Sequence, residues 1–247
     1  MASEEQKDLT YSEAIEQVMR KNGYFAPLKV IYRDIWKYKD RGGIKGKTPD
    51  YTIQERVQRD PRFTRVGVGV YALTEYLDKI QRARVPVREQ DRSEHDHSRI
   101  EGMLLEIGGI EGYDTYTRDK SKSFDGKPLR LLSILRECPR FTYGRIIEDT
   151  VAHIDVVWFN NRGFPYRCFE VENSTNFRGA LVKFSELQDF MTEFFIVSPE
   201  DRRQKYDREL GRRAFSPIAG RCQFRSYENI DAYYQGLLGY SRVKALL

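Results

Sequence analysis

The chain has 247 residues, and its 42 Lys and Arg against 37 Asp and Glu give a net charge of +5, a mildly basic balance that permits a nucleic-acid partner without requiring one. With 40% hydrophobic and 13% aromatic residues, the composition excludes an intrinsically disordered chain. Cys138, Cys168 and Cys222 form no disulfide or zinc pattern, and no apolar run approaches the roughly 18 residues of a membrane span, so we expect a soluble, cytoplasmic protein with no membrane contact.

The first 75 residues contain the signals of three short helices followed by a hairpin. Thr10 or Ser12 can cap the first helix, and Thr48-Pro49 is a capping residue with proline at the first helical position of the third. The expected helices are Leu9–Asn22, Leu28–Lys39 and Asp50–Arg59, and the expected hairpin is Phe63–Leu73 with glycines at 67 and 69. This order is typical of a winged helix-turn-helix, so the sequence predicts one for residues 1–80.

The segments LTYSEAIEQVM, TPDYTIQERVQRD and FTRVGVGVYAL, within residues 8–76, resemble the HARE-HTH family of winged helices, which are found attached to DNA-modifying, restriction and chromatin proteins. The resemblance implies that this domain binds double-stranded DNA with its third helix in the major groove. Each basic or polar residue there is also an ordinary solvated side chain when taken alone. The implied DNA-binding residues are Lys45, Lys47, Thr48, Tyr51, Gln54, Arg56, Arg59 and Arg65, with Gln58 beside them.

The stretch DKIQRARVPVREQDRSEHDHSR is highly charged and has almost no large apolar residue after Ile80. Pro86 interrupts any helix that continues into it. Such a stretch is typical of a solvated connection, so we place a linker at 81–95 between the first domain and a second one at 96–247.

The second domain alternates helical and strand patterns. It opens with a helix at His97–Gly108, ended by Gly108 or Gly109, in which His97 and Glu101 share a face because they are four residues apart. A strand at Tyr113–Thr117 and a polar loop at Ser121–Lys127 follow. The later elements are a helix at Phe177–Phe190, a strand at Glu193–Ser198, a charged helix at Pro199–Arg213, a strand at Cys222–Ser226 and a helix at Ile230–Leu238.

The sequence AHIDVVWFNNRGFPYRCFEVENST, residues 152–175, has the pattern of a hairpin with three acids. If Asn160 pairs with Gly163 across the turn, the numbers of paired residues sum to 323, and the first acid, Asp155, lies opposite Cys168. The other two acids, Glu170 and Glu172, then follow on the same face, because side chains alternate along a strand. Three acids among apolar residues are costly unless they bind a cation.

Salt bridges are the alternative partners of this acidic row. Arginines near it in the sequence, such as Arg162, Arg167 and Arg178, could neutralise the acids without any metal. Three carboxylates on one face and flanked by apolar residues are a poor arrangement for salt bridges, however, and this favours a metal site.

The order helix, three strands, helix, strand, with Asp on one strand and Glu-x-Glu on the next, resembles the PD-(D/E)xK nuclease superfamily. The blocks HSRIEGMLLEIGGIEGYDTY, AHIDVVWF, FEVENSTNFRGALVKFSEL and FIVSPEDRRQKYDRE carry this resemblance over about 95–230. It implies a restriction-endonuclease-like mixed β-sheet flanked by helices, so the fold class expected for the whole chain is α+β or α/β. It also implies that Asp155 and Glu170 bind Mg²⁺, for which Mn²⁺ substitutes, and that Glu101 completes the site.

In the superfamily's pattern a lysine stands where this chain has Glu172, and the resemblance makes Glu172 a catalytic residue beside Asp155 and Glu170. Some members of the superfamily work with glutamate at this position. A second reading is that Lys183 or Arg178, on the following helix, supplies the cation or contacts a DNA phosphate. His153 shares a face with Asp155 and could border the phosphate, whereas His97 more often caps or donates a hydrogen bond. Ser174 and Thr175 either bind a phosphate oxygen or cap the next helix.

Together these features predict a restriction-type DNA endonuclease in which the winged helix selects the site and the second domain hydrolyses a phosphodiester, leaving a 5′-phosphate. A modified base could be required. Because one such centre cuts one strand, cutting both strands needs a homodimer or two sequential events. The alternatives are a DNA-binding regulator with an inactive nuclease fold, and a nuclease acting on RNA or branched DNA.

Overall fold

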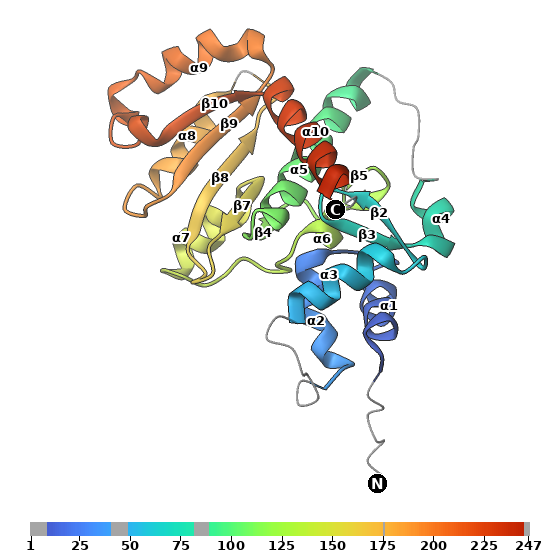
Figure 1. Ribbon diagram of the computed structural model, residues 1–247. Coiled ribbons are helices and arrows are strands. Elements are labelled where there is room, and N and C mark those ends of the chain that lie inside the picture. Colours follow the sequence, from blue (N-terminus) through green and yellow to red (C-terminus); the bar gives the residue numbers. More distant parts are fainter. Residues whose placement is uncertain (1–8, 41–48, 82–88, 175, 245–247) are drawn as a thin grey trace.

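The computed structural model describes residues 9–40, 49–81, 89–174 and 176–244 (Figure 1). The part up to residue 81, called here the N-terminal module, contains α1 (Tyr11–Lys21), β1 (Phe25–Pro27), α2 (Leu28–Asp34), α3 (Pro49–Arg59), β2 (Phe63–Gly67), β3 (Val70–Leu73) and α4 (Leu77–Gln81). Thr10 caps α1 and forms a reciprocal capping box with Glu13, as a cap at this position predicts. The sequence did not indicate β1, which pairs with β3 to make a three-stranded antiparallel sheet in the order β1-β3-β2.

Residues 89–244, called here the body, are built on a mixed five-stranded sheet in the order β10-β9-β8-β7-β4. Strands β4, β7 and β8 pair antiparallel, and β8, β9 and β10 pair parallel. The elements of the body are α5 (Glu89–Ile110), β4 (Asp114–Thr117), β5 (Ser123–Phe124), β6 (Lys127–Pro128), α6 (Leu129–Leu132), α7 (Gly144–Asp149), β7 (Val156–Phe159), β8 (Pro165–Val171), α8 (Phe177–Ser185), β9 (Glu193–Ser198), α9 (Arg203–Leu210), β10 (Cys222–Ser226) and α10 (Tyr227–Lys244).

Each face of the five-stranded sheet packs against its own pair of helices, because side chains alternate between the faces along a strand. On one face, Trp158 and Phe169 belong to a core shared with α5 and α10. On the other face, Phe159 and Cys168 pack against α8 and α9, around the buried Phe184. In Figure 1, α5 and α10 lie between the sheet and the N-terminal module. The sheet is therefore covered on both sides, and its acidic residues lie deep in the molecule.

The register of the β7–β8 hairpin differs from the predicted one by two residues. Val156 lies opposite Phe169, so the numbers of paired residues sum to 325 and not 323. The turn is one residue longer, because the Asn160 amide donates to the Phe164 carbonyl oxygen, and an irregularity between Trp158 and Phe159 adds another residue. A shift of two keeps every side chain on its expected face. Cys168 pairs with Val157, and Asp155 lies just before the first residue of β7.

Helix α5 also differs from its expected bounds. It continues through Gly108 and Gly109 to Ile110, so neither glycine ends it. At Gly108 a Cβ atom would lie 2.6 Å from the side chains of Thr115 and Trp158, so the glycine permits close packing of helix on sheet. The helix begins at Glu89, inside the stretch expected as a linker at 81–95, of which 82–88 lie outside the described residues. The expected polar loop Ser121–Lys127 contains β5 and the start of β6.

A buried polar cluster joins the N-terminal module to the body; we call it the Glu106 cluster. Glu106 on α5 accepts hydrogen bonds from the Val68 amide at 2.7 Å and the Tyr234 hydroxyl at 2.5 Å. The Lys127 ammonium lies 2.7 Å from both the Glu106 carboxylate and the Val66 carbonyl oxygen, and the side chains of Lys127 and Glu106 are fully buried. A Cβ at Gly67 would lie 2.4 Å from this carboxylate. The β2–β3 turn is thus held against the body by these hydrogen bonds.

Within the described ranges, no helix is both long enough and apolar enough to pass through a lipid bilayer.

Candidate active site

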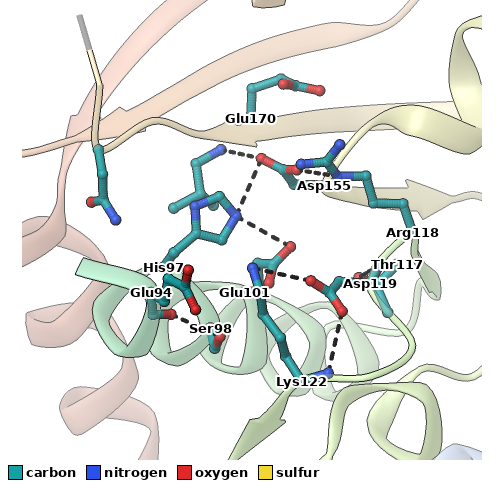
Figure 2. Close-up of polar contacts among 12 residues, drawn as sticks. Glu94, His97, Ser98, Glu101, Thr117, Arg118, Asp119, Lys122, Asp155 and Glu170 are labelled. Atoms are coloured by element: carbon teal, nitrogen blue, oxygen red, sulfur yellow. Dashed lines mark hydrogen bonds and ion pairs between the residues drawn. The ribbon is translucent and has the colours of Figure 1, made fainter. Parts of the chain in front are cut away.

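Helix α5 and the start of the β7–β8 hairpin bring three potential ligands together (Figure 2). His97 and Glu101 lie one turn apart on α5, and His97 Nε2 is 3.5 Å from Glu101 Oε1 and 3.7 Å from Asp155 Oδ2. The potential ligand atoms of these three residues lie within 4.8 Å of one another. Glu101 and Asp155 are almost completely buried, with 0% and 1% of their surfaces exposed.

The two buried carboxylates differ in their hydrogen-bond partners. Asp155 Oδ2 accepts a hydrogen bond from the Val171 amide at 2.8 Å, which fixes the carboxylate against β8. Asp155 Oδ1 lies 2.7 Å from Arg118 Nε, but the contact lacks the direction of a hydrogen bond. Among the described residues, neither oxygen of Glu101 has a hydrogen-bond partner. Buried carboxylate oxygens without donors are costly unless a cation binds them.

Glu170 on β8 is paired with a lysine from the next helix. Lys183 on α8 places its ammonium 2.7 Å from each carboxylate oxygen of Glu170 and 3.0 Å from the carbonyl oxygen of His153. Only 2% of the Glu170 side chain is exposed. Lys183 is therefore the cation beside the second strand acid, although it lies 13 residues away along the chain.

Glu172, which holds the position where the resembling superfamily has lysine, lies just beyond the end of β8. Its carboxylate accepts a hydrogen bond from Ser174 Oγ at 2.9 Å. Ser174 Oγ in turn accepts one from the Asn176 amide at the start of α8. This bond belongs to the turn before α8, whose N-cap is Asn176 and has no side-chain cap, so Ser174 does not cap the helix. Thr175 lies outside the described residues.

Burial shapes the protonation of the whole group. Burial and the charge of Asp155 raise the pKa of Glu170, although Lys183 opposes the rise. Burial also raises the pKa of Glu101, against the opposing effect of His97, and the pKa of Glu172, against the hydrogen bond from Ser174. For His97, burial lowers the pKa, but the nearby Glu101 and Asp155 outweigh it and the net pKa is raised. Several carboxylates crowded into a low-dielectric site are typical of a site for cation binding or acid–base chemistry.

The donor set fits a hard divalent cation. The two carboxylates suit Mg²⁺ or Mn²⁺, whereas the imidazole is a ligand that Mg²⁺ seldom takes, and a cluster without cysteine does not suit structural zinc. The unsatisfied oxygens of Glu101 are the observation that supports this fit. Of the predicted metal ligands, the structure thus brings Glu101 close to Asp155, whereas Glu170 on β8 lies outside this group and pairs with Lys183.

The predicted DNA-binding residues are spread more widely. Tyr51, Arg56 and Arg59 on α3 are exposed, and Arg59 pairs with Glu55 at 2.8 Å. Gln54 and Arg65 line a cavity of about 520 Å³ between the N-terminal module and the body. Arg178 is exposed on α8, whereas Lys183 points to Glu170. Lys45, Lys47 and Thr48 lie outside the described residues.

Two cations of the site are poorly indicated by the sequence. Arg118 directly follows the strand Asp114–Thr117. The sequence around it does not indicate that the end of this strand lies beside Asp155. The sequence offers Lys183 only as an alternative cation, because its partnership with Glu170 depends on how α8 folds back over the sheet. In both cases the cation comes from an element other than the hairpin.

The chain was compared with known protein families. The model of the family described as the type II restriction enzyme NmeDI C-terminal domain matches residues 78–242, which is well over half of the chain. Searches against curated proteins and against solved structures give no significant match.

Proposed function

The chain belongs to the family of the type II restriction enzyme NmeDI C-terminal domain, which suggests a restriction-type DNA nuclease, and we propose that it is a Mg²⁺-dependent DNA endonuclease. The observation that carries the metal-dependent reaction is the buried group of Glu101, Asp155 and His97, whose ligand atoms converge without donors for the Glu101 oxygens. A phosphodiester is the substrate because the family is one of DNA-cutting enzymes.

We propose that Asp155, Glu101 and His97 hold the metal ion, with Glu170 next to it. The ion would supply an activated water and neutralise charge on the phosphate, and Mn²⁺ would replace Mg²⁺ because both accept carboxylate oxygens. The Val171 amide holds Asp155 in place by its hydrogen bond to Oδ2, and α5 holds Glu101 and His97 on one face. These residues are fixed by the sheet and the helix, so the site is largely pre-organised.

Lys183 is the best candidate for the role that the resembling superfamily gives to its lysine. Its ammonium lies at the edge of the buried acids, paired with Glu170 and a quarter exposed, so it can also face a water or a phosphate oxygen. Glu172 is hydrogen-bonded to Ser174 at the rim, where it is placed to accept a proton or to hold a second cation. We therefore assign the catalytic cation to Lys183 in place of position 172, and keep Glu172 as an acid of the site.

We propose that the N-terminal module is a winged helix that contacts double-stranded DNA. Its element order α1-β1-α2-α3-β2-β3, with a three-stranded antiparallel sheet, supports this proposal, as do the exposed Tyr51, Arg56 and Arg59 on α3. Since one site cuts one strand, we expect a homodimer on DNA or two successive cuts.

Cleavage of plasmid and genomic DNA, unmodified and base-modified, in the presence of Mg²⁺ or Mn²⁺ tests the activity. Wild-type protein should cut, and Asp155→Asn and Glu101→Gln, which keep size while removing charge, should reduce the rate by at least about a hundredfold. Glu137→Gln removes one negative charge at an exposed residue outside the site and serves as the matched control. If no DNA of any kind is cut while DNA is still bound, the protein is a DNA-binding regulator with an inactive nuclease fold.

A further inference from the structure

Arg118 connects the buried acids to the surface. It follows the last residue of β4, and its Nε lies 2.7 Å from Asp155 Oδ1. Its side chain is 43% exposed, whereas that of Asp155 is only 2% exposed. Figure 2 shows the guanidinium reaching Asp155 from the side opposite His97. The guanidinium of Arg118 thus neutralises a buried acid, while much of the arginine side chain remains exposed to solvent.

Arg118 contacts Oδ1, the oxygen of Asp155 that does not accept the hydrogen bond from the Val171 amide. Oδ2 is taken by the Val171 amide, so Oδ1 is the oxygen available to a further cation. The guanidinium reaches Oδ1 without hydrogen-bond direction, which makes this a charge contact that another cation can replace. A divalent ion held by Glu101 and Asp155 would repel an arginine at the same oxygen.

The acid next to Arg118 in the chain has other partners and does not pair with the guanidinium. The next residue, Asp119, is engaged with the ammonium of Lys122 at 3.0 Å and accepts hydrogen bonds from Ser121. Burial lowers the pKa of Arg118, but Asp155, Glu170 and Glu101 outweigh it, so the site's acids hold the guanidinium in its charged form. An arginine that leaves Asp155 would keep its charge and be free to meet an anion entering from solvent.

We propose that Arg118 is an exchanging counter-charge: it neutralises Asp155 in the metal-free protein, leaves when the divalent ion binds, and then contacts the phosphate to be cut. The inference rests on the proposed metal-dependent endonuclease function. The planar guanidinium suits this second role, because it donates two parallel hydrogen bonds to phosphate oxygens. Arg118 would thereby keep the site electrically balanced in both states.

The proposal requires opposite effects of one substitution on two measurements. Arg118→Ala removes a competitor for Asp155, so Mn²⁺ should bind the DNA-free protein about three- to tenfold more tightly. The same substitution removes the interaction with the phosphate, so DNA cleavage at saturating Mn²⁺ should slow by about a hundredfold. Arg118→Lys keeps the charge and should bind Mn²⁺ within about twofold of wild type, with an intermediate cleavage rate.

Calorimetric titration of the full chain with Mn²⁺, without DNA, gives the first measurement, and single-turnover cleavage gives the second. Arg162→Ala is the matched control, because Arg162 is an exposed arginine in the turn at the opposite end of the hairpin. It should leave both values unchanged. Melting temperatures of all variants without metal verify folding, and Arg118→Lys supplies the comparison if Arg118→Ala does not fold.

Unchanged or weaker Mn²⁺ binding by Arg118→Ala would overturn the exchange, as would Arg118→Lys binding Mn²⁺ as tightly as Arg118→Ala. Tighter binding with wild-type cleavage would overturn the interaction with the phosphate. Failure of the proposed function gives a different result. If Asp155→Asn and Glu101→Gln bind Mn²⁺ as wild type does, these residues do not hold the metal, and the exchange of Arg118 with the metal is also excluded.

Discussion

Replacing Lys183 by methionine tests which residue supplies the catalytic cation. The ammonium lies 2.7 Å from both oxygens of Glu170, whose side chain is 2% exposed, while that of Lys183 is 25% exposed. Breaking a fully buried pair costs about 3–5 kcal/mol, and the exposed quarter of Lys183 reduces our expectation to about 2 kcal/mol. The metal-free protein should therefore melt about 4–8 °C lower, at roughly 2–4 °C per kcal/mol for a chain of this size.

Cleavage should be affected more than stability. Removing one pre-organised charge from an active site typically slows the reaction by about 10²–10³-fold, and we expect this loss for Lys183→Met in single-turnover cleavage at saturating Mg²⁺. Lys205→Met, at an exposed lysine of α9, is the control and should cut at the wild-type rate. The reasoning is refuted if Lys183→Met cuts within about threefold of wild type while Glu172→Gln loses the activity.

Three further predictions concern pH, the joint between the two parts, and DNA binding. The pKa of Glu170 is raised in the folded protein, so its contribution to metal-free stability is complete below the ordinary pKa of 4.5 and is lost as pH rises through the raised value. The melting temperature of wild type relative to Glu170→Gln should accordingly fall from pH 5 to 8, and Mg²⁺ should bind more weakly in acid because protons compete; a pH-independent difference contradicts this. Lys127→Met removes the cation beside the buried Glu106 carboxylate, which should cost about 3–5 kcal/mol and lower the melting temperature by about 6–20 °C. Adding Glu106→Gln should recover part of the loss in thermal denaturation. Arg56→Ala with Arg59→Ala should reduce the slope of log affinity against log salt by about 1 for each phosphate that is no longer neutralised, and an unchanged slope would mean that α3 lies away from DNA.

The sequence predicts the elements of this fold well where the signal is local. The capping box of Thr10 and Glu13 and the apolar stripe of α1 need no information from elsewhere in the chain. The shared face of the hairpin acids is also local, because period-2 alternation survives a register shift of two. The shift itself was not predictable, since it depends on a longer turn and on an irregularity beside Phe159.

The partners of the acids depend on tertiary structure. The position of Glu101 beside Asp155 follows from the packing of α5 on the sheet, which Gly108 permits by its close approach to Trp158. Arg118 and Lys183 come from β4 and α8, and no spacing in the sequence relates them to the hairpin. A sequence pattern thus identified the acids, but it could not say which cations neutralise them.

The Glu106 cluster has a consequence for building chimaeric enzymes. An N-terminal module that was connected to the body only by a linker, without packing against it, could be exchanged between nucleases as an independent unit. Here the turn around Gly67 and Val68 is seated on a buried carboxylate, and the apolar core on that side is shared between the module and the body. A graft cut at residue 81 would leave Glu106 and Lys127 without the Val68 amide and the Val66 carbonyl oxygen. A donor module for this body must therefore carry a glycine turn of the same shape, or the acceptor helix must be changed with it.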